Sequence, residues 1–304
     1  MKVKIARFVL LLIAILSVAL LMVHVYTRKL MDNVVFMVSP SSTLPSSIGS
    51  RYKEVRVGQQ DRNIRAWITL PVVVKKNNAA VIIFRGIGES LSDWIWFQKM
   101  LADSGIVSAS FDYGPPADTL KTNGNPMKGS SRLKEVTKNV QDIIDSVRLL
   151  CGPSLNLFLL GHSVGNAIML EMYPRINAPF VKGVILCNAF ASIKAWSVYH
   201  HHISPTTAFF LPDYYDNTRN IKAVVQPILM LHSKADSVNY FTDALKIYML
   251  SWERQQPVRL IPFEGYGHNY IYGKDHFDYW APIVQFIGTF PSYSGSPAPL
   301  LPVR

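Results

Sequence analysis

The stretch NLFLLGHSVGNAIML, residues 156–170, decides the fold of this chain. Five largely apolar residues run into a serine, Ser163, that stands between two glycines, and apolar residues then return at helical spacing. This pattern predicts a buried strand, a tight turn and a helix. Gly161 and Gly165 leave room for a turn that strains the backbone at Ser163. We therefore expect the Ser163 hydroxyl to project above the end of a strand.

Short β-branched runs alternate with longer amphipathic segments on both sides of this stretch. We expect strands at 52–57, 64–70, 79–84, 106–111, 155–160, 181–187, 227–232 and 258–263. We expect helices at 90–104, 131–150, 163–173, 240–252 and 276–289. The middle strands are continuously apolar, as strands covered on both faces must be. Repeated strand–helix–strand units predict an α/β fold with a mostly parallel sheet of about eight strands and flanking helices.

The ends of the chain and one inner segment break this rhythm. Residues 39–50, SPSSTLPSSIGS, are rich in serine, proline and glycine and predict a linker. Residues 191–225 carry aromatics and prolines and predict a short cap over the sheet. The expected organisation is a membrane anchor or signal sequence at 1–29, a linker at 30–50, the folded domain at 51–290 and a flexible tail at 291–304.

The N-terminal segment contains an apolar run of eighteen residues, FVLLLIAILSVALLMVHV, at 8–25. That length can span a bilayer with modest mismatch. A cleaved signal peptide is the alternative, but apolar sequence continues beyond its candidate site at Ala19, so we expect an uncleaved single-pass anchor. More basic groups precede the run than follow it. The positive-inside rule then places the body on the non-cytoplasmic side, in a periplasm, lumen or exterior, or secreted if the segment is cleaved.

Charge, hydrophobic content and cysteine number restrict the class of protein further. The formal net charge is +11, but five basic residues precede Asp32 without any acid, and no basic block interleaved with aromatics follows. We therefore expect no nucleic-acid partner. With 49% hydrophobic residues the chain can form a core. The two cysteines, Cys151 and Cys187, make neither a disulfide framework nor a metal set, and we expect buried free thiols.

The residues after two later strands complete a candidate catalytic unit with Ser163. A serine hydroxyl needs a base that takes its proton and an acid that orients this base. Asp236 and His268 follow the strands at 227–232 and 258–263, at the same sheet edge as Ser163. Their chain order is the one expected of such a unit. Alternatives for the acid are Asp213 and Asp216, and the rival histidines are His162, His232 and His276.

Two backbone N–H groups are expected to form an oxyanion hole, from Val164 directly after the serine and from Ile87 in the glycine-rich turn at 84–88. Neither a dinucleotide-binding nor a phosphate-binding glycine loop fits the sequence, so this chemistry asks for no cofactor. Three consecutive histidines at 200–202 invite a metal hypothesis, but adjacent residues seldom point at one ion. We expect a cap loop there and no metal.

From Tyr52 to Thr289 the sequence resembles the α/β-hydrolase superfamily. The segment YYDNTRNIKAVVQPILMLHSKADSV is similar to the small-capped branch that includes membrane-anchored α/β-hydrolase-domain proteins and relatives labelled serine aminopeptidases. The resemblance implies hydrolysis of an ester or thioester, lipid-like or small, through an acyl-enzyme. It gives Ser163 as nucleophile, His268 as base and then acid, and Asp236 as its orienter. Alternatives are an acyltransferase or an amidase or aminopeptidase on the same residues, and a non-catalytic binding module.

The sequence departs from the family pattern at two positions. Arg85 replaces the histidine that usually starts the oxyanion loop, and Ser233 replaces the glycine expected after His232. Backbone donors survive a change of side chain, so the oxyanion hole need not be lost. Arg85 would bring a cation near the reaction centre, which leads to the hypothesis that it favours substrates carrying phosphate or carboxylate.

Overall fold

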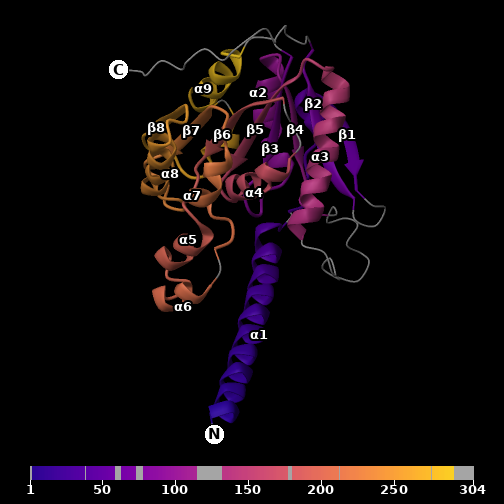
Figure 1. Ribbon diagram of the computed structural model, residues 1–304. Helices are drawn as coiled ribbons and strands as arrows, with labels where there is room; N and C mark the ends of the chain where they lie inside the picture. Colours follow the sequence, from indigo (N-terminus) through magenta and orange to yellow (C-terminus); the bar gives the residue numbers. More distant parts are fainter. Residues whose placement is uncertain are drawn as a thin grey trace.

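A computed structural model describes residues 2–37, 39–58, 63–72, 78–114, 132–176, 180–211, 213–274 and 276–290. Within them one eight-stranded sheet has the order β1-β2-β4-β3-β5-β6-β7-β8 (Figure 1). The strands are β1 (Arg51–Val57), β2 (Ile64–Leu70), β3 (Ala79–Phe84), β4 (Val107–Phe111), β5 (Asn156–His162), β6 (Val181–Cys187), β7 (Ile228–Ser233) and β8 (Val258–Phe263). β2 runs antiparallel to both its neighbours, and the other pairs are parallel. The predicted mostly parallel sheet is confirmed.

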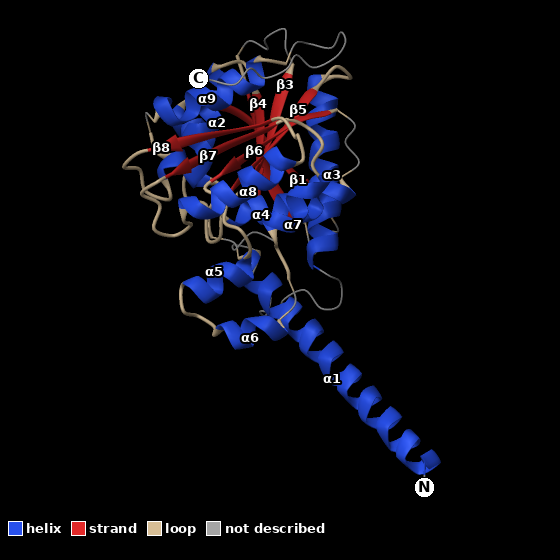
Figure 2. Cartoon of the chain, turned by 60° about the vertical axis from the view of Figure 1, so that its left-hand side comes forward, coloured by secondary structure: helices blue, strands red, loops and turns tan. Residues whose placement is uncertain are grey.

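Helices cover both faces of this sheet, as Figure 2 shows. Alternate residues of β3 belong to two separate buried clusters, Ala80 and Ile82 to one and Val81 and Ile83 to the other. Both sets are apolar because a strand between two helical layers has no solvent face. The covering helices are α3 (Arg132–Cys151), α4 (Val164–Met172) and α8 (Phe241–Glu253) on one face, and α2 (Ile95–Asp103) and α9 (Phe277–Gly288) on the other.

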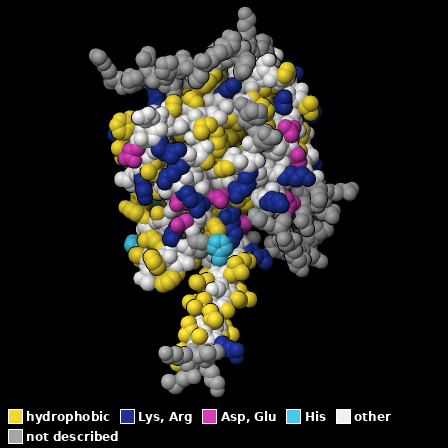
Figure 3. All heavy atoms as spheres, in the orientation of Figure 1, with side chains coloured by type: hydrophobic (Ala, Val, Ile, Leu, Met, Phe, Trp, Pro, Cys, Tyr) yellow, Lys and Arg dark blue, Asp and Glu magenta, His cyan; other side chains and the backbone are white. Residues whose placement is uncertain are grey.

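The N-terminal helix α1 (Lys2–Val35) is longer than the sequence predicted. Its segment Ile5–Lys29 is long and apolar enough to cross a membrane, and it projects from the domain with apolar side chains exposed (Figure 3). The helix then continues through residues predicted to be a linker. Val35 and Phe36 are buried in the core, and Pro45 is buried in a short 3-10 helix. Within the range predicted as a linker, Val35, Phe36 and Pro45 therefore pack against the domain.

Three short helices lie between β6 and β7, where the sequence predicted a cap. They are α5 (Ile193–Tyr199), α6 (Pro205–Phe210) and α7 (Asn217–Asn220). In Figures 1 and 2, α5 and α6 extend from the domain on the side from which α1 projects. The cap is thus adjacent to the part of α1 that leaves the domain. The tail predicted at 291–304 lies outside the described residues.

Candidate active site

Ser163 occupies a strained turn between β5 and α4. Its backbone angles are φ 52° and ψ −122°, a conformation that non-glycine residues rarely adopt. A Cβ on Gly161 would lie 2.6 Å from the Asn166 Cα atom, and a Cβ on Gly165 would lie 2.0 Å from the carbonyl oxygen of Phe84. Both glycines are therefore required by close backbone approach. The strain and this crowding hold the hydroxyl at the carboxyl end of β5.

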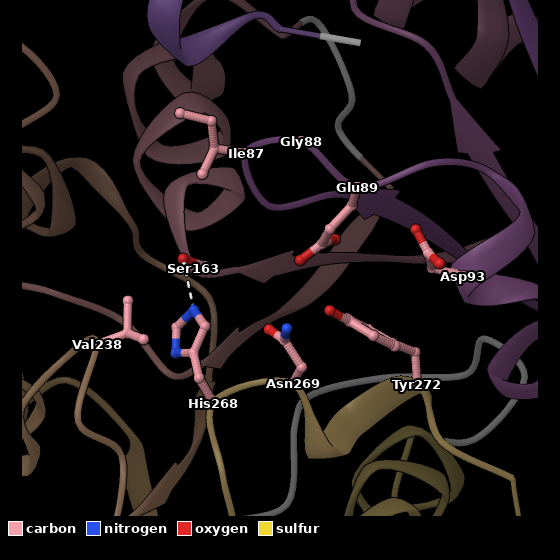
Figure 4. A pocket seen from close by; sticks show the side chains of 9 residues that line it. All are labelled: Ile87, Gly88, Glu89, Asp93, Ser163, Val238, His268, Asn269 and Tyr272. Atoms are coloured by element: carbon pink, nitrogen blue, oxygen red, sulfur yellow. Dashed lines mark hydrogen bonds between the residues drawn. The ribbon is translucent and has the colours of Figure 1, made fainter. Parts of the chain in front are cut away.

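The structure brings Ser163, His268 and Asp236 into one hydrogen-bonded chain. The Nε2 atom of His268 lies 2.9 Å from Oγ of Ser163, and its Nδ1 atom lies 2.7 Å from Oδ2 of Asp236 (Figure 4 shows the first contact). A carboxylate beside Nδ1 favours the tautomer that carries its proton there. Nε2 is then free to accept the hydroxyl proton of Ser163.

Asp236 is held as a carboxylate in a buried position. Its other oxygen, Oδ1, accepts hydrogen bonds from the backbone N–H groups of Val238 (2.8 Å) and Asn239 (2.9 Å). Burial raises the pKa of Asp236, but the hydrogen bond and charge of His268 and these two N–H groups outweigh it and lower the pKa below its usual value. Asp236 therefore stays ionised and fixes the orientation of the His268 ring.

The alternative acids are engaged elsewhere. Asp213 pairs with Lys194 at 3.1 Å, and Asp216 caps α7 by accepting a hydrogen bond from the backbone N–H of Arg219 at 3.0 Å. Both lie in the cap segment, and neither has a hydrogen bond to His268 among the described contacts. The structure therefore favours Asp236 over both as the group that orients His268.

The rival histidines are also accounted for. The ring of His232 bonds the backbone oxygen of Asn239 at 2.8 Å, and burial lowers its pKa. The Nδ1 atom of His276 lies 2.5 Å from the backbone oxygen of Tyr270, and its ring stacks on the Tyr270 ring. Neither ring has a hydrogen bond to Ser163 within the described part of the chain.

His162, inside the turn, forms a buried ion pair with Glu89. Its Nδ1 atom lies 2.6 Å from Oε1 of Glu89, and its Nε2 atom lies 3.0 Å from the backbone oxygen of His268. Burial opposes charge on both groups, yet their mutual attraction and hydrogen bond raise the pKa of His162 and lower the pKa of Glu89. Oε2 of Glu89 accepts from the backbone N–H of Gly86 at 2.7 Å. The pair thus joins the Ser163 turn, the His268 loop and the loop that holds Ile87.

Arg85 does not face the reaction centre, so the hypothesis that it selects charged substrates is wrong. Its side chain is 1% exposed and its Nη2 atom lies 2.8 Å from Oδ1 of Asp112. Nη2 and Nε also donate to the backbone oxygen of Phe111, at 2.9 and 3.1 Å. The guanidinium is neutralised inside the domain and anchors the loop after β3 to the end of β4. At the second departure from the family pattern, the Ser233 hydroxyl donates to the backbone oxygen of Tyr266.

Two asparagines support the site, and sequence reasoning missed both. The side-chain N–H of Asn239 points to Oγ of Ser163 at 3.4 Å and donates to the backbone oxygen of Asn188 at 2.7 Å. Asn188 in turn donates to the backbone oxygen of His268 at 2.7 Å. Asn239 lies three residues after Asp236 in the same loop, and that proximity was the one signal available. Nothing in the sequence around Asn188 marks it.

Two pockets meet at the serine and share Ile87, Ser163 and Val238. The first has a volume of about 280 Å³ and a lining that is polar and apolar in similar parts, with Glu89, Asp93, His268, Asn269 and Tyr272 as its more polar side (Figure 4). The second has a volume of about 340 Å³ and a mainly apolar lining that includes Met31, Val35, Phe190, Ile193 and Trp196. Ile87 and Val164, the expected oxyanion donors, both border the second pocket. We refer to them as the polar pocket and the apolar pocket.

The three consecutive histidines lie at the end of α5 and in the turn that follows it. His202 lines the apolar pocket and stacks on Trp196 with ring centroids 5.2 Å apart. Among the described residues no group of three or more His, Cys, Asp or Glu side chains is placed to hold a metal ion. Cys151 and Cys187 are both free thiols.

Comparisons with known proteins agree with this architecture. Residues 75–223 match the family described as serine aminopeptidase, S33. The chain is 24% identical to the lysophosphatidylserine lipase ABHD12 of Macaca fascicularis over 254 residues, 70% of this chain and 61% of that protein. It is 30% identical to the uncharacterized protein YfhR of Escherichia coli K12 over 133 residues, 43% of this chain and 45% of that one. The chain thus spans about half to three-fifths of the length of these relatives.

Solved structures share the fold at low sequence identity. An esterase of Pyrococcus furiosus, Pf2001, superimposes with a TM-score of 0.61 at 12% identity, covering 83% of this chain and 97% of that one. A carboxyl esterase of Bacillus coagulans gives 0.58 at 18% identity, covering 78% and 98%. The sheet order, the turn at Ser163 and these solved structures show that the chain has the α/β-hydrolase fold.

Proposed function

We propose that the chain is a serine hydrolase that cleaves an acyl ester or thioester through an acyl-enzyme on Ser163. The observation that carries the proposal is the hydrogen-bonded chain from Ser163 through His268 to Asp236, with contacts of 2.9 and 2.7 Å. Named relatives described as a lysophosphatidylserine lipase and as esterases support the class of reaction.

The geometry supports a two-stage reaction. Oγ of Ser163 attacks the carbonyl carbon of the substrate while Nε2 of His268 takes the hydroxyl proton, and Asp236 stabilises the imidazolium. The carbonyl oxygen becomes an oxyanion, which the backbone N–H groups of Val164 and Ile87 would stabilise. The tetrahedral intermediate expels the alcohol or thiol as His268 returns the proton to it. Water, activated by His268, then attacks the acyl-enzyme and releases the carboxylic acid.

The two pockets support an orientation of the substrate. His268 has to protonate the leaving group, so the leaving group lies on the side of Ser163 where His268 is exposed to the cavity. That side is the polar pocket, which His268 lines. The acyl group then lies in the apolar pocket, whose Phe190, Ile193 and Trp196 suit a hydrocarbon chain.

The N-terminal helix supports a membrane-tethered enzyme. Ile5–Lys29 can cross a bilayer by length and composition. Basic residues are more numerous before the apolar run than after it, which favours a cytoplasmic N-terminus and a domain on the non-cytoplasmic side. Protease protection of the domain in sealed vesicles, followed by loss of protection on permeabilisation, tests this topology and the retention of the anchor.

Labelling with a fluorophosphonate, which reacts with activated serines, tests the proposed chemistry. We expect the full chain to be labelled and the Ser163→Ala variant to lose labelling while keeping the same thermal unfolding midpoint. Ser237→Ala is a matched control because Ser237 is an exposed serine in the Asp236 loop. Labelling of the Ser163→Ala protein would contradict the assignment. A panel of p-nitrophenyl esters and aminoacyl anilides distinguishes an esterase from an aminopeptidase.

A further inference from the structure

The end of the helix that carries the candidate membrane anchor forms part of the wall of the apolar pocket. Met31 and Val35, from the last two turns of α1, line this pocket together with Ser163. Val35 is 1% exposed and Met31 is partly buried, so both side chains pack against the domain where they line the pocket. One continuous helix, α1, therefore joins the candidate membrane span Ile5–Lys29 to the cavity at the nucleophile.

We propose that α1 and the cap together form an acyl-chain site that takes a long hydrocarbon chain directly from the bilayer. This inference rests on the proposed function, which places the acyl group of the ester in the apolar pocket and the leaving group in the polar pocket. It adds that the anchor is a binding element of the site as well as a tether.

The end of α1 is fixed firmly enough to act as a wall. Nε of Arg28 lies 3.0 Å from Oδ1 of Asp32, which also accepts a hydrogen bond from Tyr215 of the cap segment at 2.6 Å. The Arg28 guanidinium lies over the Tyr215 ring, 4.9 Å from its centroid. Buried Phe36 follows directly in the core. These contacts lie on both sides of Met31 and keep the pocket-lining turn in place.

The apolar pocket reaches the surface between α1 and the cap. Ser163 and Phe190 are buried at its inner end, whereas Met31 is partly exposed and His202 is exposed. Met31 lies just after the apolar segment Ile5–Lys29, and His202 follows α5. α5 and α6 extend on the side from which α1 projects (Figures 1 and 2). If α1 crosses a bilayer, an opening between α1 and the cap would face it.

The cap also presents its own apolar surface on that side. Phe209 and Phe210 in α6 are 80% and 66% exposed and contact each other at 5.3 Å between ring centroids. Four residues later, the hydroxyl of Tyr214 donates to the backbone oxygen of His24, inside the apolar segment, at 3.0 Å. Tyr and Trp are enriched at the membrane–water interface, and Phe side chains occur on the apolar face of helices that lie in it. The bilayer crossed by α1 is therefore the occupant that fits this surface, and a chain in that leaflet meets the pocket opening.

Photo-crosslinking tests the site without requiring hydrolysis. The Ser163→Ala chain, reconstituted in phosphatidylcholine vesicles, is irradiated with palmitic acid that carries a terminal diazirine. We expect crosslinks in the segments around Met31 and at 190–197 that an excess of unlabelled palmitic acid removes. Met31→Trp should lose these crosslinks. Met22→Trp is the matched control, since Met22 is 68% exposed on the projecting part of α1. Crosslinks confined to residues 5–25, or insensitive to the competitor, would overturn the proposal.

Chain-length selectivity gives the second measurement. Filling the pocket with Met31→Trp should lower kcat/KM for p-nitrophenyl dodecanoate by about tenfold or more, with p-nitrophenyl butanoate within about twofold of wild type. Met31→Ala is a second variant for the case in which Met31→Trp does not fold. It should also lower kcat/KM for the dodecanoate more than for the butanoate. An equal loss for both esters would count against a chain site. If the wild type crosslinks as expected but cleaves no ester, the proposed function fails and the chain site stands.

Discussion

Oε1 of Glu89 lies 2.6 Å from Nδ1 of His162, so an ion pair is buried directly behind the nucleophile. Burial of both groups opposes their charges, but their mutual attraction lowers the pKa of Glu89 from 4.5 and raises the pKa of His162 from 6.5. The pair is adjacent to all three loops of the site. It is therefore a positioning element whose charge state should be visible in the stability of the fold.

The stability that this pair contributes should depend on pH in both directions. The contribution of Glu89 is present above its usual pKa of 4.5 and is lost as pH falls through its lowered folded value. The contribution of His162 is complete below 6.5 and is lost as pH rises through its raised folded value. We expect Glu89→Gln to lower the free energy of unfolding by about 2 kcal/mol between the usual pKa values of 4.5 and 6.5, where both contributions are present. The loss should be smaller at higher pH, where His162 is neutral.

Denaturant unfolding of the full chain in detergent, repeated across the pH range, measures this difference. Glu264→Gln is the control, because Glu264 is exposed and pairs with Lys234 at the surface. It should change stability by less than about 0.5 kcal/mol at any pH. A Glu89→Gln effect that stays constant as His162 titrates would show that the pair is not ionic.

Gly165 should not tolerate any side chain. In Gly165→Ala the new Cβ would lie 2.0 Å from the carbonyl oxygen of Phe84, so the β3 loop or the start of α4 has to move. We expect a loss of about 2 kcal/mol of stability together with loss of fluorophosphonate labelling. Gly288→Ala is the matched control, since no atom lies within 4 Å of its Cβ position. Equal melting temperatures for the two variants would contradict the crowding.

Most strands could be predicted closely because they are short apolar runs between polar residues; β1, with four charged residues, is the exception. The expected strands at 64–70, 79–84, 181–187 and 258–263 coincide with β2, β3, β6 and β8, and the ends of the other four differ by at most two residues. The order of Ser163, Asp236 and His268 could be read from the strand ends, because parallel strands end at one edge of the sheet. Their contacts of 2.9 and 2.7 Å agree with that expectation.

The end of α1 and the role of Arg85 were harder to predict from the sequence than the strands. Arg28 and Lys29 mark the end of the apolar run, yet no glycine or proline stops the helix before residue 40. The side chain of Arg85 pairs with Asp112, which is distant in sequence. Likewise, nothing local indicates that Val35 lines a pocket with Ser163. Such contacts depend on packing between remote segments, which residue spacing does not encode.

Phe36 should make the end of α1 an integral part of the fold. Its ring is fully buried and contacts Tyr113 and Tyr215 with centroids 5.6 and 6.2 Å away. We expect Phe36→Ala to lower the free energy of unfolding by about 3 to 5 kcal/mol, as for other buried phenylalanines. Phe8→Ala, on the exposed part of α1, should leave the unfolding of the domain unchanged. Equal stability of the two variants would mean that the helix end is not part of the core.

Asp236 should be required for turnover but not for folding of the site. In Asp236→Asn the amide can still bond Nδ1 of His268, but it favours the tautomer in which Nε2 carries the proton and cannot accept that of Ser163. We expect kcat to fall by roughly 10³ to 10⁴ for any ester that the wild type cleaves, in line with the same change in other serine triads. Asp213→Asn is the matched control, because that aspartate pairs with Lys194 in the cap. A large loss in Asp213→Asn with little change in Asp236→Asn would transfer the orienting role to the cap.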